Sequence, residues 1–168
     1  MIQDVDRLLF ILTLLILTLL AALGCGLIAG VFFAFSTFVM KALVRLPASH
    51  GIAAMQSINV VVLNRWFLGA FLGTAILCAV AMIGAILRWQ MPNAIYLIVG
   101  GALYLVGSFL VTIVFNVPKN ESLAALAPDD PRGADAWALY VSDWTAWNHV
   151  RTAASLAAAA SLSLGLAA

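Results

Sequence analysis

The chain has 168 residues, of which 65% are hydrophobic and 9% are charged, and its formal net charge is +1 at pH 7. A soluble domain of this length cannot bury so much apolar surface, so the composition excludes an ordinary soluble protein. The sequence contains no basic run, phosphate loop or dinucleotide glycine pattern, and no nucleic acid is expected as a partner. The expected partner is the lipid bilayer.

Four segments are apolar for about the 20 residues that a membrane-spanning helix needs. The predicted helices cover residues 8–40, 66–88, 93–117 and 144–167. The first charge-free run is too long for a straight span, so its helix is expected to tilt or to project past the membrane. The sequence therefore predicts an all-α fold, with residues 1–168 forming a single transmembrane domain, an integral membrane four-helix bundle.

Short helices at the membrane surface are expected on one side of this bundle. Residues 51–63 suit an interfacial helix, because thirteen residues extend only about 20 Å and cannot cross the membrane. After the third span, Pro118 is expected to end the helix and Asn120 to cap a short one. Asp143 is the expected N-cap of the fourth span.

Small residues within the spans indicate close helix packing. Gly26 and Gly30 form one GxxxG pair, and Gly69 and Gly73 form another. The fourth helix consists almost entirely of small residues after position 151, which favours a place inside the bundle. Both cysteines, Cys25 and Cys78, lie within predicted spans and are expected to be buried, inert thiols.

Basic residues are distributed unequally between the two membrane sides. Arg7 and Arg88 belong to the side that holds both termini, whereas six lysines and arginines belong to the other. The positive-inside rule therefore predicts a multi-pass protein of the cytoplasmic membrane with that second side in the cytoplasm. The six basic residues are Lys41, Arg45, Arg65, Lys119, Arg132 and Arg151.

Polar residues gather at helix ends on that same side, whereas the opposite side offers little beyond Arg88, Gln90 and Asn93. Taken singly, each is explained as a helix cap, a turn residue or an interfacial anchor. As a set they predict a site, because buried amides need partners and anchors have no reason to avoid one membrane face. The set comprises Lys41, Gln56, Asn59, Asn64, Arg65, Asn116, Lys119, Asn120, Asn148, His149 and Arg151.

Four motifs in this order resemble the anthrone oxygenase-like family of small four-helix membrane proteins. They are FxxFSTFVMKAL at 32–43, MQSIN at 55–59, NVPKN at 116–120 and WxxWNHVR at 144–151. The resemblance extends over about residues 25–160 and implies the four-helix fold. Some members oxidise an anthrone to an anthraquinone with molecular oxygen and no recognised cofactor. The reaction that the resemblance implies is therefore a cofactor-independent monooxygenation of a small hydrophobic aromatic molecule.

Such chemistry needs a base, donors for an enolate oxygen and an apolar pocket. His149 is the candidate base, although on an ideal helix it points away from Arg151. Arg151, Asn148 and Asn116 are the other candidate catalytic residues, as donors to the enolate. The candidate substrate-binding residues are Gln56, Asn59, Lys119, Asn120, Trp66, Trp144 and Trp147.

No metal and no cofactor are expected, because His50 and His149 lack any accompanying ligand pattern. Two non-enzymatic alternatives remain open: a transporter of a small solute, and an accessory subunit of a membrane complex. If the protein is an enzyme, an apolar pocket is expected beneath the polar residues. A transporter would have a path open to both sides, and an accessory subunit would have a flat polar surface. Whether the chain forms a homo-oligomer is left open by the sequence.

Overall fold

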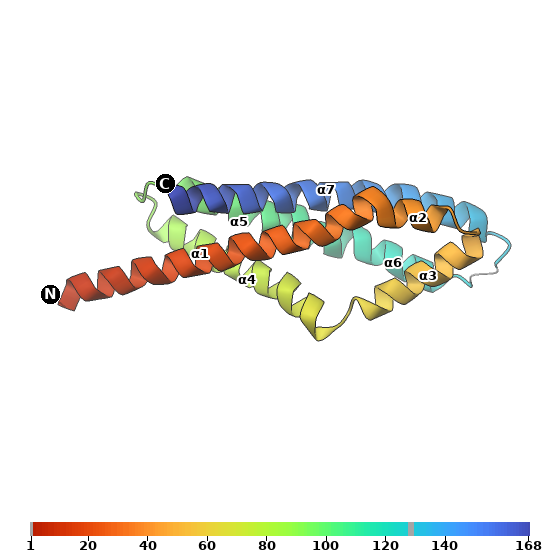
Figure 1. The fold of residues 1–168 in the computed structure, drawn as a ribbon, viewed down its shortest axis with the longest axis horizontal. Coiled ribbons are helices and arrows are strands. Elements are labelled where there is room, and N and C mark those ends of the chain that lie inside the picture. The colour runs from red at the N-terminus through yellow and green to blue at the C-terminus, as the bar shows by residue number, and fades with distance from the viewer. Residues whose placement is uncertain (1, 128–129) are drawn as a thin grey trace.

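The computed structural model describes residues 2–127 and 130–168, and the regular elements within them are all helical (Figure 1). Three of the elements, labelled η, are π-helical turns within longer helices. In chain order the elements are α1 (Ile2–Ala34), η1 (Phe35–Val39), α2 (Met40–Val44), α3 (Ala48–Val61), α4 (Arg65–Leu87), α5 (Ala94–Tyr104), η2 (Leu105–Leu110), η3 (Thr112–Asn116), α6 (Val117–Ala124) and α7 (Gly133–Ala167).

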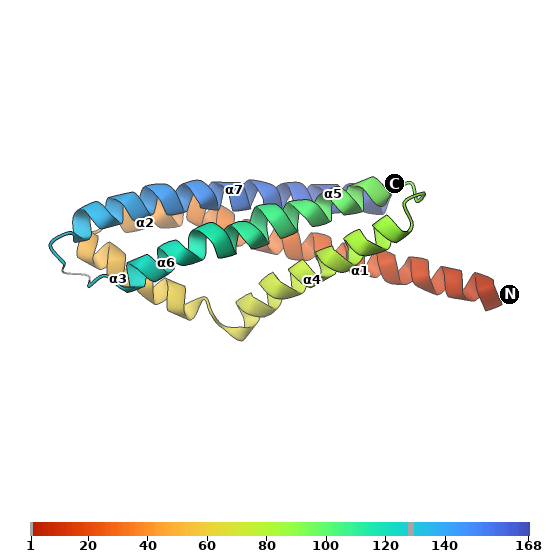
Figure 2. The same cartoon turned by 180° about the vertical axis from the view of Figure 1, so that it is seen from behind.

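Four helical segments are long and apolar enough to cross a membrane: Ile11–Val44, Arg65–Leu87, Ala94–Ala124 and Gly133–Ala167. The predicted all-α membrane bundle is thereby confirmed, and the chain has the architecture of an integral multi-pass membrane protein. The start of α1 projects past the other helices in both views (Figures 1 and 2). At the other end, α2, α3, α6 and the start of α7 gather together, and the N-terminal end of α4 splays away from the bundle.

The last helix begins at Gly133, not at the predicted residue 144, and continues without a break to Ala167. Its buried residues recur every three or four positions from Trp137 through Tyr140 and Trp144 to Gly165, so one face of the helix stays buried along its length. Asp143 therefore lies inside the helix and is no N-cap. Its carboxylate instead accepts a hydrogen bond from Lys119 on α6 at 2.9 Å.

Pro118 does not end the third span, which was a wrong prediction. A proline inside an α-helix lacks its N–H and clashes with the carbonyl four residues earlier. Here the π-helical turn η3 directly precedes α6, and Pro118 occupies the first turn of that new helix, where a missing N–H costs little. Asn120 accordingly lies within α6 and caps no helix.

The two GxxxG pairs do not pack against other helices within the described chain, contrary to the expectation. A Cβ atom placed on Gly26, Gly30, Gly69 or Gly73 would meet nothing within 4 Å. The close approach occurs elsewhere, because a Cβ on Gly101 would lie 2.9 Å from the Cys78 carbonyl oxygen. The cysteines are free, buried thiols whose sulfur atoms lie 3.6 Å apart, joining α1 to α4.

This difference between glycines predicts opposite effects of the same substitution. Gly101→Ala should lower the free energy of unfolding in detergent by about 1–3 kcal/mol, because the methyl group meets a backbone oxygen that cannot move freely. Gly73→Ala, with open space around it, should leave stability unchanged or raise it slightly through helix propensity. Thermal unfolding of the purified variants measures both, and equal losses would contradict the assigned packing.

Candidate functional site

Arg151 lies at the centre of the polar end, on the buried face of α7, and only 4% of its surface is exposed. Its Nη2 donates to Asn148 Oδ1 at 2.7 Å and its Nη1 to Thr112 Oγ1 at 3.2 Å. The guanidinium carbon lies 4.2 Å from the centre of the Phe32 ring and 5.1 Å from that of Trp144. Within the described chain no carboxylate pairs with this cation, so a buried positive charge is held by neutral groups alone.

Asn148 links Arg151 to α1 through hydrogen bonds. Its Nδ2 donates to the Phe32 carbonyl oxygen at 2.8 Å and to Ser36 Oγ at 2.7 Å, and its side chain is fully buried. Ser36 Oγ also lies 3.1 Å from Thr152 Oγ1. Because Asn148 uses its amide hydrogens on α1 and η1, its oxygen is left to accept from Arg151, which fixes the position of the guanidinium.

Two of the π-helical turns, η1 and η3, contain residues of this hydrogen-bond network. Ser36 belongs to η1, and Thr112 belongs to η3. A π-turn adds a residue to the helix turn and rotates the following side chains, and such turns concentrate at functional sites. Asn116, at the end of η3, donates to the Trp144 carbonyl oxygen at 3.2 Å and is also buried. The turns therefore aim polar side chains of two helices at α7.

A cavity of about 500 Å³ lies beside Arg151, between α1, α3, α4, η3, α6 and α7. Most of its wall is apolar. Its aromatic lining comes from Phe32, Phe35, Phe67, Phe71, Phe109 and Trp144, and its polar lining from Gln56, Asn59, Thr112, Asn120, Glu121 and Arg151. The cavity reaches the surface where α3 meets α4, because Val60 and Leu63 line it and are also largely exposed.

Three hydrogen-bond donors of residues that line this cavity have no partner in the described part of the chain. They are Arg151 Nε, Asn59 Nδ2 and Trp144 Nε1. A buried donor without an acceptor costs about 1–3 kcal/mol, so such atoms are rarely left unpaired. Unpaired donors on residues of the cavity wall, together with the unpaired charge of Arg151, favour a ligand that carries an anionic oxygen.

A family model described as anthrone oxygenase matches residues 63–161. The chain belongs to the anthrone oxygenase family. The match covers more than half of the sequence and includes two of the motifs on which the resemblance depends, at 116–120 and 144–151. Comparison with the curated proteins and with the solved structures gives no match. The family match confirms the resemblance. It does not specify a reaction for this anthrone oxygenase-family protein.

Several predicted site residues meet at the cavity of this family member, and others lie around it. Arg151, Asn59, Gln56, Asn120 and Trp144 line the cavity. Gln56 also donates from Nε2 to the carbonyl oxygens of Leu123 and Leu126, both at 2.8 Å, which fixes the end of α6 to α3. Asn148 and Asn116 are buried behind the cavity wall, where they position Arg151 and Trp144 through hydrogen bonds.

Besides Asn148 and Asn116, four more predicted residues do not line the cavity. His149 is exposed on α7, away from the buried face that carries Arg151. Trp66 is 76% exposed with Arg65 stacked over its ring, as expected of a membrane-surface anchor. Trp147 stacks on Phe115 with ring centres 3.6 Å apart. Lys119 instead lines a second, smaller pocket.

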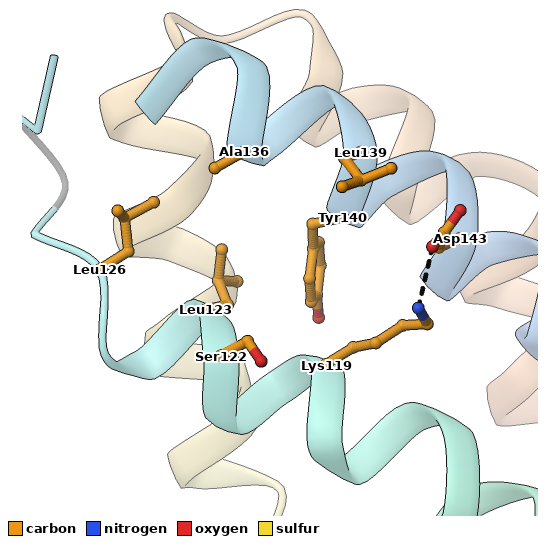
Figure 3. Close-up of a pocket in the computed structure, with 8 residues that line it drawn as sticks. All are labelled: Lys119, Ser122, Leu123, Leu126, Ala136, Leu139, Tyr140 and Asp143. Atoms are coloured by element: carbon orange, nitrogen blue, oxygen red, sulfur yellow. Dashed lines mark hydrogen bonds and ion pairs between the residues drawn. The ribbon is translucent and has the colours of Figure 1, made fainter. Parts of the chain in front are cut away.

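This second pocket, of about 270 Å³, lies between α6 and α7 (Figure 3). Lys119 and Asp143 form an ion pair on one side of it, and Leu123 and Leu126 line the other. The Tyr140 ring stands between the two helices, and its hydroxyl donates to Asn120 Oδ1 at 2.9 Å. Since Asn120 lines the large cavity, the Tyr140–Asn120 bond forms part of the wall between the two spaces.

The residues that the sequence analysis missed are mostly small and hydroxylated. Ser36, Thr112 and Thr152 complete the network, yet hydroxyls within a membrane span usually bond to their own helix and carry no signal of a site. Tyr140 could have been found, because it continues the stripe of Trp144, Asn148 and Arg151 by one turn. No group of three or more His, Cys, Asp or Glu residues suited to a metal ion occurs among the side chains that the structure describes.

The network predicts that arginine cannot be replaced by lysine at position 151. Arg151→Lys removes the planar fork that reaches Asn148 and Thr112 together, so the free energy of unfolding in detergent should fall by about 1–3 kcal/mol. The matched control is Arg132→Lys, at a largely exposed loop residue paired with Asp130, which should behave as the wild type. Similar unfolding midpoints for both variants would mean that Arg151 is only a membrane-surface anchor.

Proposed function

We propose that this protein is a cofactor-independent oxygenase that binds a planar phenolic or anthrone-like molecule in the large cavity and oxidises it with molecular oxygen. The observation that carries the proposal is a buried cation without a carboxylate partner in the described chain, at the wall of an aromatic cavity. Fused aromatic rings suit the phenylalanine lining. The anionic oxygen that such a substrate gains on deprotonation suits Arg151.

The chemistry follows from the keto form of the substrate. Loss of a proton from its ring methylene leaves the electron pair in an extended enolate, with negative charge on the former carbonyl oxygen. In this proposal Arg151, with Asn59 and Trp144 as further donors, stabilises that oxygen in a largely apolar cavity, where such donors are more effective than in water. The enolate gives electrons to oxygen, a carbon–oxygen bond forms, and loss of water from the protonated peroxide leaves a second carbonyl. One methylene ketone and one O₂ thus give one quinone and one water.

The location of the cavity favours an enzyme over the two alternatives. Its lining comes from residues 31–72, 109–124, 144 and 151, and none from 73–108 or 152–168, so the cavity stays at one end of the bundle. A transport path would need polar or open space along the other half, where α1, α4, α5 and α7 pack around Cys25, Cys78, Leu97 and Tyr104. A flat docking surface would need no cavity at all.

The orientation of the site is part of the same proposal. Six of the eight lysines and arginines of the sequence lie on the side of the polar end, which favours a cytoplasmic membrane location with the cavity near the cytoplasmic face. A hydrophobic substrate would then reach the opening between α3 and α4 from the bilayer or its inner surface.

Filling the cavity tests the proposal. Leu68 lines the cavity on α4, and Leu68→Trp should abolish binding of an anthrone, measured by quenching of tryptophan fluorescence, and its oxidation, measured by oxygen uptake and quinone absorbance. The control Ile76→Trp adds the same ring two turns along α4 at an exposed position that is 64% accessible, and should retain both activities. Boiled protein gives the background of spontaneous oxidation.

In the same assay, Arg151→Gln should lower the kcat for quinone formation by about 10²–10³-fold, as expected for removal of an oxyanion donor. Wild-type protein that neither binds nor oxidises any anthrone above background would overturn the proposal. Equal losses in the Leu68→Trp and Ile76→Trp variants would show that the cavity is not the place of reaction.

A further inference from the structure

The proposed reaction needs a base, and the predicted base does not meet the cavity. His149 is exposed on α7 and is not among the residues that line it. Of the lining side chains, only Arg151 and Glu121 are titratable, and Arg151 remains protonated. Glu121 is therefore the one carboxylate at the cavity in the described part of the chain.

The face of α6 that meets the cavity explains how Glu121 is placed. Val117, Asn120, Glu121 and Ala124 all line the cavity, at spacings of three and four residues that put them on one side of the helix. Asn120 on this face is held by the Tyr140 hydroxyl, and the end of α6 is fixed to α3 by Gln56. The carboxylate thus stands on a helix whose position is determined at two points.

The Glu121 carboxylate is also free to act. Asp143 is paired with Lys119, and Asp130 is paired with Arg132. Glu121 forms neither an ion pair nor a side-chain hydrogen bond with any side chain that the structure describes, in residues 9, 11–127 and 130–168. It is exposed as well as lining the cavity, so the carboxylate is accessible to solvent.

The separation of Glu121 from Arg151 suits the substrate. In an anthrone the acidic methylene and the carbonyl lie on opposite sides of the central ring, so the base and the donor to the oxygen must face each other across the molecule. Arg151 is bonded to Thr112 at the start of η3, and Glu121 lies nine residues further along, on α6. Arg151 and Glu121 both line the cavity, so the guanidinium and the carboxylate belong to different parts of its wall.

We infer that Glu121 is the general base of the proposed reaction and takes the proton from the ring methylene of the bound substrate. This inference rests on the proposed function. In the step, the carbon–hydrogen bond breaks, its proton forms a bond to a Glu121 carboxylate oxygen, and its electron pair enters the enolate whose oxygen is held by Arg151. No oxidant is needed for this half of the reaction, which therefore proceeds without oxygen.

Proton removal can be measured apart from oxidation. Wild-type protein in detergent is incubated without oxygen in deuterated buffer with anthrone, and loss of the methylene proton signal is followed by nuclear magnetic resonance. The protein should accelerate exchange over background. Glu121→Gln should lower the protein-catalysed exchange rate by about 10²–10⁴-fold, the usual contribution of a general base. Binding of anthrone, followed by fluorescence quenching, should persist in this variant.

Three further variants make the result specific. Glu121→Asp should retain part of the exchange activity. Asp135→Asn, at an exposed carboxylate of α7 outside the cavity, and His149→Gln, at the base first suggested by the sequence, should both exchange as the wild type does. The unfolding midpoint of each variant is measured in the same detergent.

The outcomes separate this inference from the proposed function. Normal exchange by Glu121→Gln, or loss of exchange in His149→Gln alone, would overturn the role of Glu121 and leave the oxygenase proposal intact. A wild type that oxidises anthrone without accelerating exchange would also overturn the role of Glu121 and leave the oxygenase proposal intact. Loss of both binding and exchange in Glu121→Gln would have the same meaning. A wild type that neither binds, exchanges nor oxidises anthrone would overturn both.

Discussion

The positive charge of Arg151, buried within the bundle, is the constraint on which the polar end of this protein depends. Burying an unpaired guanidinium is costly, and among the described residues the oxygens of Asn148 and Thr112 and the faces of Phe32 and Trp144 offset that cost. These partners come from α1, η3 and α7, so three of the four membrane-spanning segments are held in register by one side chain. The charge that remains uncompensated is what makes the neighbouring cavity suited to an anionic oxygen.

The other features of this end follow from that requirement. The π-turns η1 and η3 bring Ser36 and Thr112 to face α7, and Asn148 turns its oxygen toward the guanidinium because its amide hydrogens are used on α1. Away from this end, small residues allow the helices to pack closely without a polar network. Gly101 on α5 approaches the backbone of α4 at Cys78. The bundle is thus tightly packed at one end, and the large cavity lies at the other. At that end the start of α4 diverges from the other helices (Figure 1).

Membership of the anthrone oxygenase family gives this arrangement a chemical context without assigning each role. The base that the sequence suggested, His149, does not line the cavity, whereas Glu121 does. In the proposed reaction, Arg151 and Glu121, which both line the aromatic cavity, supply the cation and the base for an enolisable ketone. Asn59 and Trp144 are the proposed neutral donors to its oxygen.

The sequence by itself determined the class of fold, because charge-free segments of this length are stable only as membrane helices, and it also indicated which end is polar. It identified Arg151, Asn148 and Trp144 on one stripe, since helical spacing alone sets that relation. It failed at Pro118, at the start of α7 and at the GxxxG pairs, because a π-turn, a continuous buried stripe and the true helix contacts arise only between segments distant in the chain. Tertiary structure alone decided that Ser36 and Thr112 join the network, that His149 faces outward and that Glu121 reaches the cavity, because these depend on how each helix is rotated against its neighbours.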